Sequence, residues 1–239
     1  MRGIASGQRR QAPRAYTRRT ARASVDSTWL FNFGADIYAW FTAQAAWRSS
    51  CARMAAQLAP HDVRRIVDLG CGPGVSTFEL ARLLPRAQLV GLDVAPRMLA
   101  QARRREPLSL PSISWLRADA ARLPFPTASI DACTGHSFLY LVADRAAVLG
   151  EVWRVLRPGG QLVLMEPNAA AATVPAVLAV SRDPRHLVSV SLWRPFSRLH
   201  GRFSAHTLAA TLAGAGFEPG HVEPVLGGLG LLACATRPG

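Results

Sequence analysis

The chain has 239 residues, of which 49% are hydrophobic, so it is long enough to bury one sizeable core. Its formal net charge is +13, and all 28 basic residues are arginines. The four cysteines are scattered without a C-x-x-C pair, and no apolar run reaches the roughly 18 residues that a membrane span requires. This composition argues against a disulfide framework, a metal site and a membrane-spanning protein, and we expect a cytoplasmic protein.

The first 24 residues form a basic segment with seven arginines, no acid and almost no large apolar side chain. Such a segment cannot bury enough apolar surface to fold, so we expect 1–24 to be a disordered tail. The tail could contact an anionic membrane peripherally or bind RNA, or it could simply be solvated. In the remainder, 21 arginines stand against 15 acids, so residues 25–239 are only modestly basic and are expected to form a single domain.

Aromatic residues are concentrated between positions 29 and 47, before the first predicted strand. From Ala35 onward the apolar spacing is that of a helix, which Pro60 closes. The spacing is compatible with a helix that covers a binding site and with one that only packs on the core. The aromatic residues are Trp29, Phe31, Phe33, Tyr38, Trp40, Phe41 and Trp47.

A strand followed by a glycine-rich turn and a helix begins at Arg64. The apolar strand at Ile66–Val67 ends on Asp68, glycines occupy positions 70, 72 and 74, and a helical pattern covers 75–84. Glycines allow positive φ and bring bare backbone against a ligand, as nucleoside-binding α/β sheets do after their first strand. A dinucleotide fingerprint would need glycine at 75, where Val75 stands. The pattern therefore favours a nucleoside site over a pyrophosphate site, with a ligand-free tight turn as the alternative.

The rest of the chain alternates between strands and helices, as a mostly parallel sheet requires. Strands are predicted at 87–92, 113–116, 130–135 and 161–165, helices at 95–106, 145–156 and 204–214, and an antiparallel strand pair at 217–226 and 229–236. Asp93, Asp119 and His136 each follow a strand, and Asp93 stands about where a ribose-binding carboxylate sits. Residues 168–203 break the alternation and are interpreted as an insertion over the carboxyl edge of the sheet.

Four sequence blocks resemble the class I S-adenosylmethionine-dependent methyltransferases, in particular the branch with ubiquinone and menaquinone C-methyltransferases. They are VDLGCGPG, VGLDVAPRML, RADAARLPFP and EVWRVLRPGGQLVLMEP, and the likeness covers about residues 63–167, with a weaker part from Phe203 onward. The resemblance implies a Rossmann-like α/β fold: a seven-stranded, mostly parallel sheet with helices on both faces and an antiparallel C-terminal strand pair. It also implies a helical lid at 25–62, an insertion over the active site at 168–203, and S-adenosylmethionine as cofactor.

The resemblance also implies which positions contact the cofactor. Asp68 would orient the glycine turn and reach the methionine ammonium group, and Asp93 would accept hydrogen bonds from the ribose hydroxyls. Asp119 would take the adenine amino group. The other implied contacts are Gly70, Cys71, Gly72 and Gly74 in the turn, Met98 against the adenine face, the backbone of Ala120, and His136.

Methyl transfer from a sulfonium depends mainly on positioning the acceptor close to the methyl group. This is why the recognisable motifs are cofactor-binding motifs and none of them identifies a catalytic acid or base. The resemblance places His136 between cofactor and acceptor, where it could be a general base, with Tyr140 four residues further on. A histidine held by hydrogen bonds for structural reasons is the alternative. No metal is expected.

Three functions are compatible with these motifs. The first is methyl transfer to a small, apolar or aromatic metabolite, and the second is an RNA methyltransferase that uses the basic tail. Nucleic acid is disfavoured because the N/D-P-P-Y/F and Pro-Cys motifs are absent and the basic run has no interleaved aromatics for stacking. The third is a non-catalytic S-adenosylmethionine-binding protein, against which the intact Asp68, Asp93 and glycine turn argue. The motifs do not distinguish C-, N- and O-methylation or indicate an oligomeric state.

Overall fold

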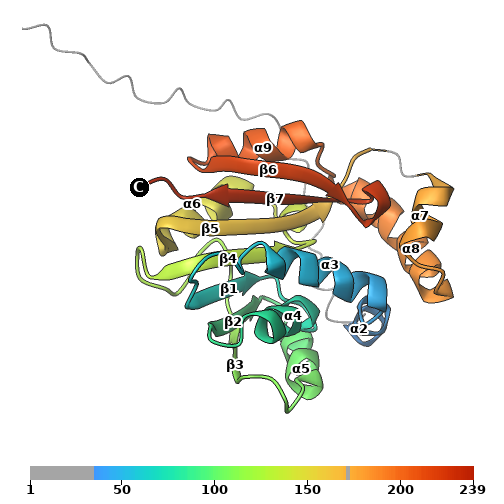
Figure 1. The fold of residues 1–239 in the computed structure, drawn as a ribbon, viewed down its shortest axis with the longest axis horizontal. Helices are drawn as coiled ribbons and strands as arrows, with labels where there is room; N and C mark the ends of the chain where they lie inside the picture. The colour runs from blue at the N-terminus through green and yellow to red at the C-terminus, as the bar shows by residue number, and fades with distance from the viewer. Residues whose placement is uncertain (1–34, 171–172) are drawn as a thin grey trace, which may run out of the picture.

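The computed structural model describes residues 35–170 and 173–239. The basic tail at 1–24 and the aromatics Trp29, Phe31 and Phe33 lie outside the described residues. Seven strands form one sheet in the order β3-β2-β1-β4-β5-β7-β6 (Figure 1). The strands are β1 Arg65–Leu69, β2 Gln88–Asp93, β3 Ile113–Arg117, β4 Ile130–His136, β5 Leu156–Pro167, β6 Glu218–Val225 and β7 Gly230–Thr236.

The first five strands pair in parallel, whereas β7 is antiparallel to both of its neighbours, β5 and β6. This confirms the predicted seven-stranded, mostly parallel sheet with an antiparallel C-terminal pair. The strand order reverses direction between β1 and β4, because the chain adds β2 and β3 on one side of β1 and then crosses to the other side. Open α/β sheets bind ligands at the carboxyl ends of the strands beside such a switch point.

Helices cover both faces of the sheet. Alternate residues of β1 point to opposite faces: Ile66 packs with α3 and α4, and Val67 packs with α6 and α9. The helices are α2 Ala35–Thr42, α3 Ala45–Ala56, α4 Val75–Leu83, α5 Pro96–Arg105, α6 Arg145–Val155, α7 Val174–Val180, α8 Pro184–His200 and α9 Ala205–Gly214, with short 3₁₀ turns η1 Leu139–Leu141 and η2 Leu226–Gly228.

Two boundaries differ from the sequence prediction. The helix expected from Ala35 to Pro60 is two helices, α2 and α3, with Gln44 in extended backbone between them. Strand β5 begins at Leu156 rather than at Gln161, because Leu156 pairs with Ile130 and the backbone of Gly160 accepts a hydrogen bond from Arg237. The Pro-Gly-Gly run therefore lies within the strand's span instead of separating it from the preceding helix.

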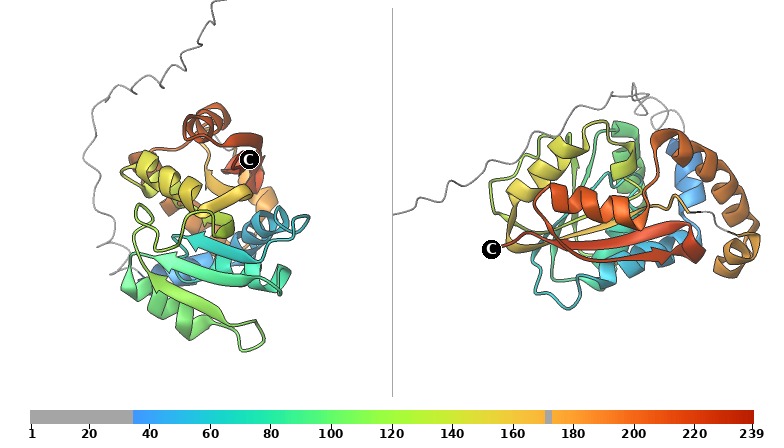
Figure 2. Two further views of the ribbon diagram at one scale, coloured as in Figure 1. Left: turned by 90° about the vertical axis from the view of Figure 1, so that its left-hand side faces the viewer. Right: turned by 90° about the horizontal axis from the view of Figure 1, so that it is seen from above.

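The stretch at 168–203 contains two helices that the sequence pattern did not predict. Asp183 begins α8, because its side chain accepts a hydrogen bond from the backbone N–H of Arg185. Helices α7 and α8 stand with α2 beyond the end of β5, at the carboxyl edge of the parallel strands (Figures 1 and 2). Within the described ranges, no helix combines the length and the apolar character needed to cross a membrane.

Candidate active site

A cavity of about 420 Å³, here called the main cavity, opens at the carboxyl edge of the parallel strands. It is within the size range of small-molecule sites in proteins. Elements distant in sequence supply its wall, because the carboxyl ends of β1, β2, β3 and β4 share one edge. The predicted site residues on this wall are Gly70, Gly72, Asp93, Met98, Asp119, Ala120 and His136.

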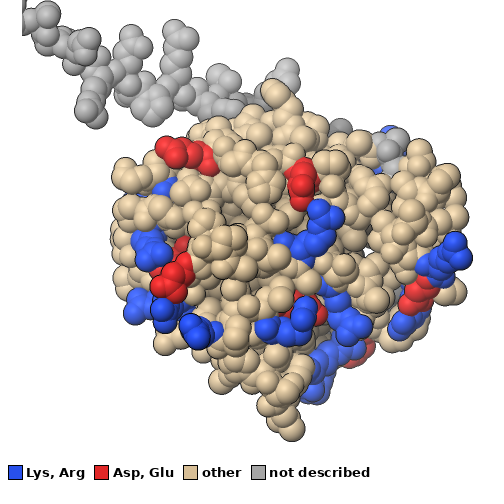
Figure 3. All heavy atoms as spheres, in the orientation of Figure 1, with Lys and Arg blue, Asp and Glu red and all other residues tan. Residues whose placement is uncertain are grey.

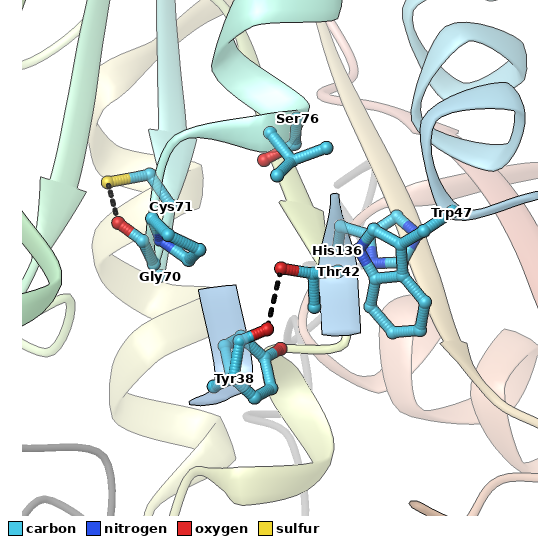
Figure 4. A pocket seen from close by; sticks show the side chains of 10 residues that line it. Tyr38, Thr42, Trp47, Gly70, Cys71, Ser76 and His136 are labelled. Carbon is cyan, nitrogen blue, oxygen red and sulfur yellow. Dashed lines mark hydrogen bonds between the residues drawn. The ribbon is translucent and has the colours of Figure 1, made fainter. Parts of the chain in front are cut away.

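A smaller space, here called the side pocket, adjoins the main cavity and shares four wall residues with it. Tyr38 and Thr42 of α2 and Trp47 of α3 face the glycine turn and His136 across this pocket (Figure 4). Cys71 lies on its wall. The N-terminal helices therefore line this pocket, which is one of the two arrangements that their sequence left open.

Gly70 begins the turn after β1 with a φ of 60°, in the left-handed region. Any side chain at this position would also meet Phe138, because an added Cβ would overlap the Phe138 ring. The Phe138 ring, which precedes η1, packs directly against the turn at Gly70. Gly70 is thus required both by its backbone conformation and by the space available.

We expect Gly70→Ala to lower the free energy of unfolding by about 1–2 kcal/mol, the usual penalty of a left-handed backbone for a residue with a Cβ, with the overlap at Phe138 adding to it. Gly150→Ala is the matched control, because Gly150 lies in α6 with open space around its added Cβ. That control should raise the free energy of unfolding by about 0.5–1 kcal/mol. Urea denaturation of both variants tests the pair, and equal stabilities would contradict it.

Asp68 lies behind the glycine turn and is 1% exposed. Its carboxylate accepts hydrogen bonds from Ser76 Oγ at 2.6 Å and Thr77 Oγ1 at 2.7 Å in the first turn of α4, and from Thr134 Oγ1 of β4 at 2.8 Å. Burial raises the pKa of Asp68, and the three hydroxyl groups oppose that shift. Asp68 is on the wall of neither the main cavity nor the side pocket, so the structure shows it orienting the turn and does not place it in reach of a ligand.

Asp93 at the end of β2 connects the cavity to the glycine turn. Its Oδ2 accepts the N–H of Gly72 at 2.9 Å, and its Oδ1 accepts the N–H of Ala95 at 2.8 Å. Burial raises the pKa of Asp93, while these N–H groups act in the opposite direction. A carboxylate oxygen accepts more than one hydrogen bond, so each oxygen retains capacity for a hydroxyl group in the cavity.

The far end of the main cavity has an acidic group and an apolar surface. Asp119 is exposed, and its Oδ1 accepts the N–H of Ala121 at 2.9 Å. Met98 is 2% exposed and packs with Ala95 and Tyr38. Met98, Ala120 and Asp119 all line the main cavity, which therefore offers apolar surface and a hydrogen-bond acceptor.

His136 is the last residue of β4 and borders both the main cavity and the side pocket. Its Nε2 lies 2.9 Å from Ser50 Oγ, and the Trp47 ring lies against it with ring centroids 4.6 Å apart. Burial lowers the pKa of His136 to about 4, so the imidazole is neutral at pH 7. A neutral imidazole beside a cavity is chemically able to accept a proton.

Tyr140 does not share the position of His136, although only four residues separate them. Ser137 takes a left-handed φ of 53°, so the chain turns sharply after β4. The Tyr140 ring is 3% exposed and packs edge-on against Phe196 of α8, with centroids 6.5 Å apart. It borders neither the main cavity nor the side pocket, and the structure therefore places Tyr140 in the packing under α8.

Glu166 near the end of β5 is a buried acid that the sequence analysis did not single out. Its carboxylate accepts the N–H groups of Phe138, Leu139 and Tyr140 at 3.2, 2.7 and 3.1 Å. Burial raises the pKa of Glu166 to about 7, against these N–H groups and the Arg145 guanidinium. A buried acid needs hydrogen-bond partners. The presence of an acid within an apolar strand was therefore the feature of the sequence that could have indicated the importance of Glu166.

The cysteines are not arranged for nucleophilic or metal chemistry. Burial raises the pKa of Cys71, Cys51 and Cys133, so their thiols stay protonated. Among residues 35–170 and 173–239, no group of three or more His, Cys, Asp or Glu side chains is arranged to hold a metal ion.

Comparison with known proteins shows that part of this chain is similar to methyltransferases. Residues 67–164 match a model described as a methyltransferase domain. A demethylmenaquinone methyltransferase of Thermus thermophilus is 40% identical over 137 residues, which cover 57% of this chain and 57% of that protein. A trans-aconitate 2-methyltransferase of Azoarcus sp. is 39% identical over 107 residues, which cover 45% of this chain and 40% of that protein. The chain thus matches only about half the length of these relatives.

The fold is shared over a longer stretch than the sequence. A plantazolicin methyltransferase, solved in complex with SAH, aligns with a TM-score of 0.67 over 92% of this chain and 95% of that one, at 12% identity. At this identity the likeness concerns the fold alone. The sequence match runs from β1 into β5, so it includes the turns that build the main cavity, and it supports the expected methyltransferase class. Residues 67–164 of this chain therefore resemble a methyltransferase domain, and the fold around them is that of solved methyltransferases.

Proposed function

We propose that this protein transfers a methyl group from S-adenosylmethionine to a small, apolar or aromatic metabolite. The observation that carries the proposal is the main cavity, where Asp93 and the glycine turn share one wall with Asp119 and Met98. When bound, the cofactor supplies an electrophilic methyl group on a sulfonium ion. The protein's own task is then to align an acceptor with that group, which is worth effective molarities of about 10⁵–10⁸ M in well-oriented reactions.

The wall residues fit the cofactor by their chemistry. The Asp93 carboxylate would accept hydrogen bonds from the two ribose hydroxyls, and Asp119 would accept one from the adenine amino group. Met98 would lie against the adenine face, and Ala120 would supply its backbone N–H group. Gly70 and Gly72 would border the methionine and ribose parts, with Cys71 and Gly74 shaping the same turn, and Asp68 would act through the turn that it anchors.

The acceptor side is formed by segments outside the matched domain. We propose that the segment 25–62 is a lid and that 168–203 covers the site, because Trp47 of α3 and Trp193 of α8 meet edge to face, with centroids 6.2 Å apart, directly beside His136. In this arrangement His136 is a candidate catalytic residue, and Tyr140 would support α8 rather than touch the acceptor.

An apolar or aromatic acceptor fits better than a polyanion. The named relatives act on demethylmenaquinone and on trans-aconitate, a quinone and a tricarboxylate. Among the described residues, the wall of the main cavity carries Asp93, Asp119 and Asp144, and neither it nor the side pocket includes an arginine. A tricarboxylate would find no arginine to pair with on either wall among the described residues, whereas a quinone-like ring would contact Trp47 and Tyr38.

An RNA substrate is a weaker proposal. On the face in Figure 3, arginines are interspersed with acids instead of forming one continuous basic surface. Several arginines are paired, as Arg53 with Glu223 and Arg82 with Glu79 show. Nucleic-acid surfaces cluster unpaired cations along the phosphate track.

Calorimetry with S-adenosylmethionine and with its demethylated product tests the cofactor assignment. We expect binding of both, with dissociation constants on the order of micromolar, and no heat with NAD. Binding of NAD without binding of either methionine derivative would overturn the proposal. Incubation with methyl-labelled S-adenosylmethionine and quinol or phenol acceptors then tests transfer itself.

A further inference from the structure

The hydroxyl group of Ser50 determines which nitrogen of His136 carries the proton. Ser50 Oγ lies 2.7 Å from the backbone carbonyl of Trp47, one turn earlier in α3. A carbonyl oxygen only accepts, so the single hydroxyl proton of Ser50 is donated to Trp47. Toward His136, 2.9 Å away, Ser50 Oγ can therefore act only as an acceptor. The neutral imidazole is then protonated at Nε2.

The second nitrogen of His136 is left as a bare base. Nδ1 is buried and has no hydrogen-bond partner on another described residue, and the backbone of His136 itself is the nearby group that raises the pKa of the ring. A buried polar atom without a partner is uncommon and requires an explanation, such as a ligand that pairs with it. His136 itself is 8% exposed and borders both the main cavity and the side pocket, so a ligand between the two would reach the ring.

We propose that Ser50 is a positioning residue that holds His136 in the Nε2–H tautomer, so that Nδ1 accepts a proton from the methyl acceptor. This inference rests on the proposed function and names the acceptor class: a molecule with an acidic O–H group whose oxygen, or a carbon conjugated with it, takes the methyl group, as in a phenol, an enol or a hydroquinone. Helix α3 carries Ser50 and Trp47, and β4 ends on His136. In this proposal α3 both covers the end of β4 and determines the tautomer of His136.

The step balances in charge and atoms. A lone pair or enol π pair of the acceptor forms the new bond to carbon, and the pair of the broken sulfur–carbon bond stays on sulfur. The acceptor's proton moves to the lone pair of Nδ1. One positive charge is lost at sulfur as one appears on the imidazole, so the buried site does not gain net charge. This offsets the burial penalty that lowers the pKa of His136 in the resting protein.

Nuclear magnetic resonance of the full chain with ¹⁵N-labelled histidine reads this tautomer directly, without any need for turnover. Six histidines are present, and His136→Gln assigns the relevant signals by their loss. We expect the wild type at neutral pH to show a protonated Nε2 and a bare Nδ1. Ser50→Ala should give a mixture of tautomers, and Ser50→Thr, which keeps the hydroxyl, should restore the wild-type spectrum. A wild type protonated at Nδ1, or an unchanged tautomer in Ser50→Ala, would overturn the proposal.

A second measurement tests what Nδ1 faces. 1-Naphthol, a phenolic probe, is titrated into the labelled protein saturated with S-adenosylhomocysteine. We expect the Nδ1 resonance to shift more than the Nε2 resonance, and an unmoved Nδ1 would show that the atom does not face the acceptor site. Affinity for S-adenosylhomocysteine should stay within about twofold in Ser50→Ala. If the wild type did not bind S-adenosylhomocysteine, the proposed function would be overturned. The tautomer of His136 could still be measured by the first experiment, so the two failures are distinguishable.

Discussion

Replacing Asp93 by alanine should weaken the binding of S-adenosylhomocysteine on the order of 100-fold, or by about 3 kcal/mol. The change removes the acceptor for two ribose hydroxyls, and hydrogen bonds to a charged group contribute about 1.5–3 kcal/mol each. It also frees the N–H group of Gly72 in the glycine turn and the N–H group of Ala95 at the start of α5, both of which the carboxylate now holds. The ligand and the backbone that cradles it would be affected together.

Asp119→Ala is the matched control for this experiment. Asp119 is also an acid on the cavity wall, but it is exposed and would accept a single hydrogen bond from the adenine amino group. We expect its loss to cost about 1 kcal/mol, since water competes for an exposed group. Isothermal titration calorimetry below the melting temperature of each variant gives both values. Equal losses at the two positions, or an unchanged affinity in Asp93→Ala, would show that the ribose is held elsewhere.

The wall of the main cavity could be predicted from the sequence because it is built from repeated local units. Each strand is followed by its own polar residue, and parallel strands bring those residues to one edge of the sheet. Asp93 and Asp119 are on the wall for this reason. Asp68 also stands at the end of a strand, but its carboxylate accepts hydrogen bonds from the hydroxyl groups of Ser76, Thr77 and Thr134. The spacing of residues in the sequence does not reveal such partners.

The acceptor side could not be predicted in the same way, because its contacts join distant segments. Ser50 and His136 are 86 positions apart, and in the sequence Ser50 is an ordinary polar residue of a helix. Tyr140 follows His136 by four residues, but the left-handed backbone of Ser137 turns the chain between them, so the catalytic role of Tyr140 stays a prediction. The helices of 168–203 also escaped prediction, because many of their apolar side chains, such as Val188, Leu192 and Leu199, are exposed and follow no buried stripe.

Glu166 lies between the proposed acceptor side and the core. Its ionisation should change the free energy of unfolding as the pH is varied. The backbone of η1 is held from two directions: Glu166 accepts its N–H groups, and Arg145 donates to the carbonyl oxygens of Leu139 and Tyr140. Burial places the pKa of Glu166 at about 7, above the ordinary value of 4.5. Because the folded state then binds this proton more tightly than the unfolded state, the contribution to stability is largest below pH 4.5 and is lost as the pH rises through 7.

We therefore expect the stability difference between the wild type and Glu166→Gln to change with pH. From pH 5 to pH 8, the wild type should lose about 2–3 kcal/mol of unfolding free energy relative to the variant, which cannot ionise at this position. Glu151→Gln is the control, because the pKa of Glu151 is lowered by its hydrogen bonds with Arg154 and its titration falls below this range. The difference for Glu151→Gln should be flat between the two pH values. Urea denaturation at pH 5 and pH 8 measures both. A flat difference for Glu166→Gln would mean that the three N–H groups and Arg145 outweigh burial, so that η1 rests on a permanently ionised carboxylate.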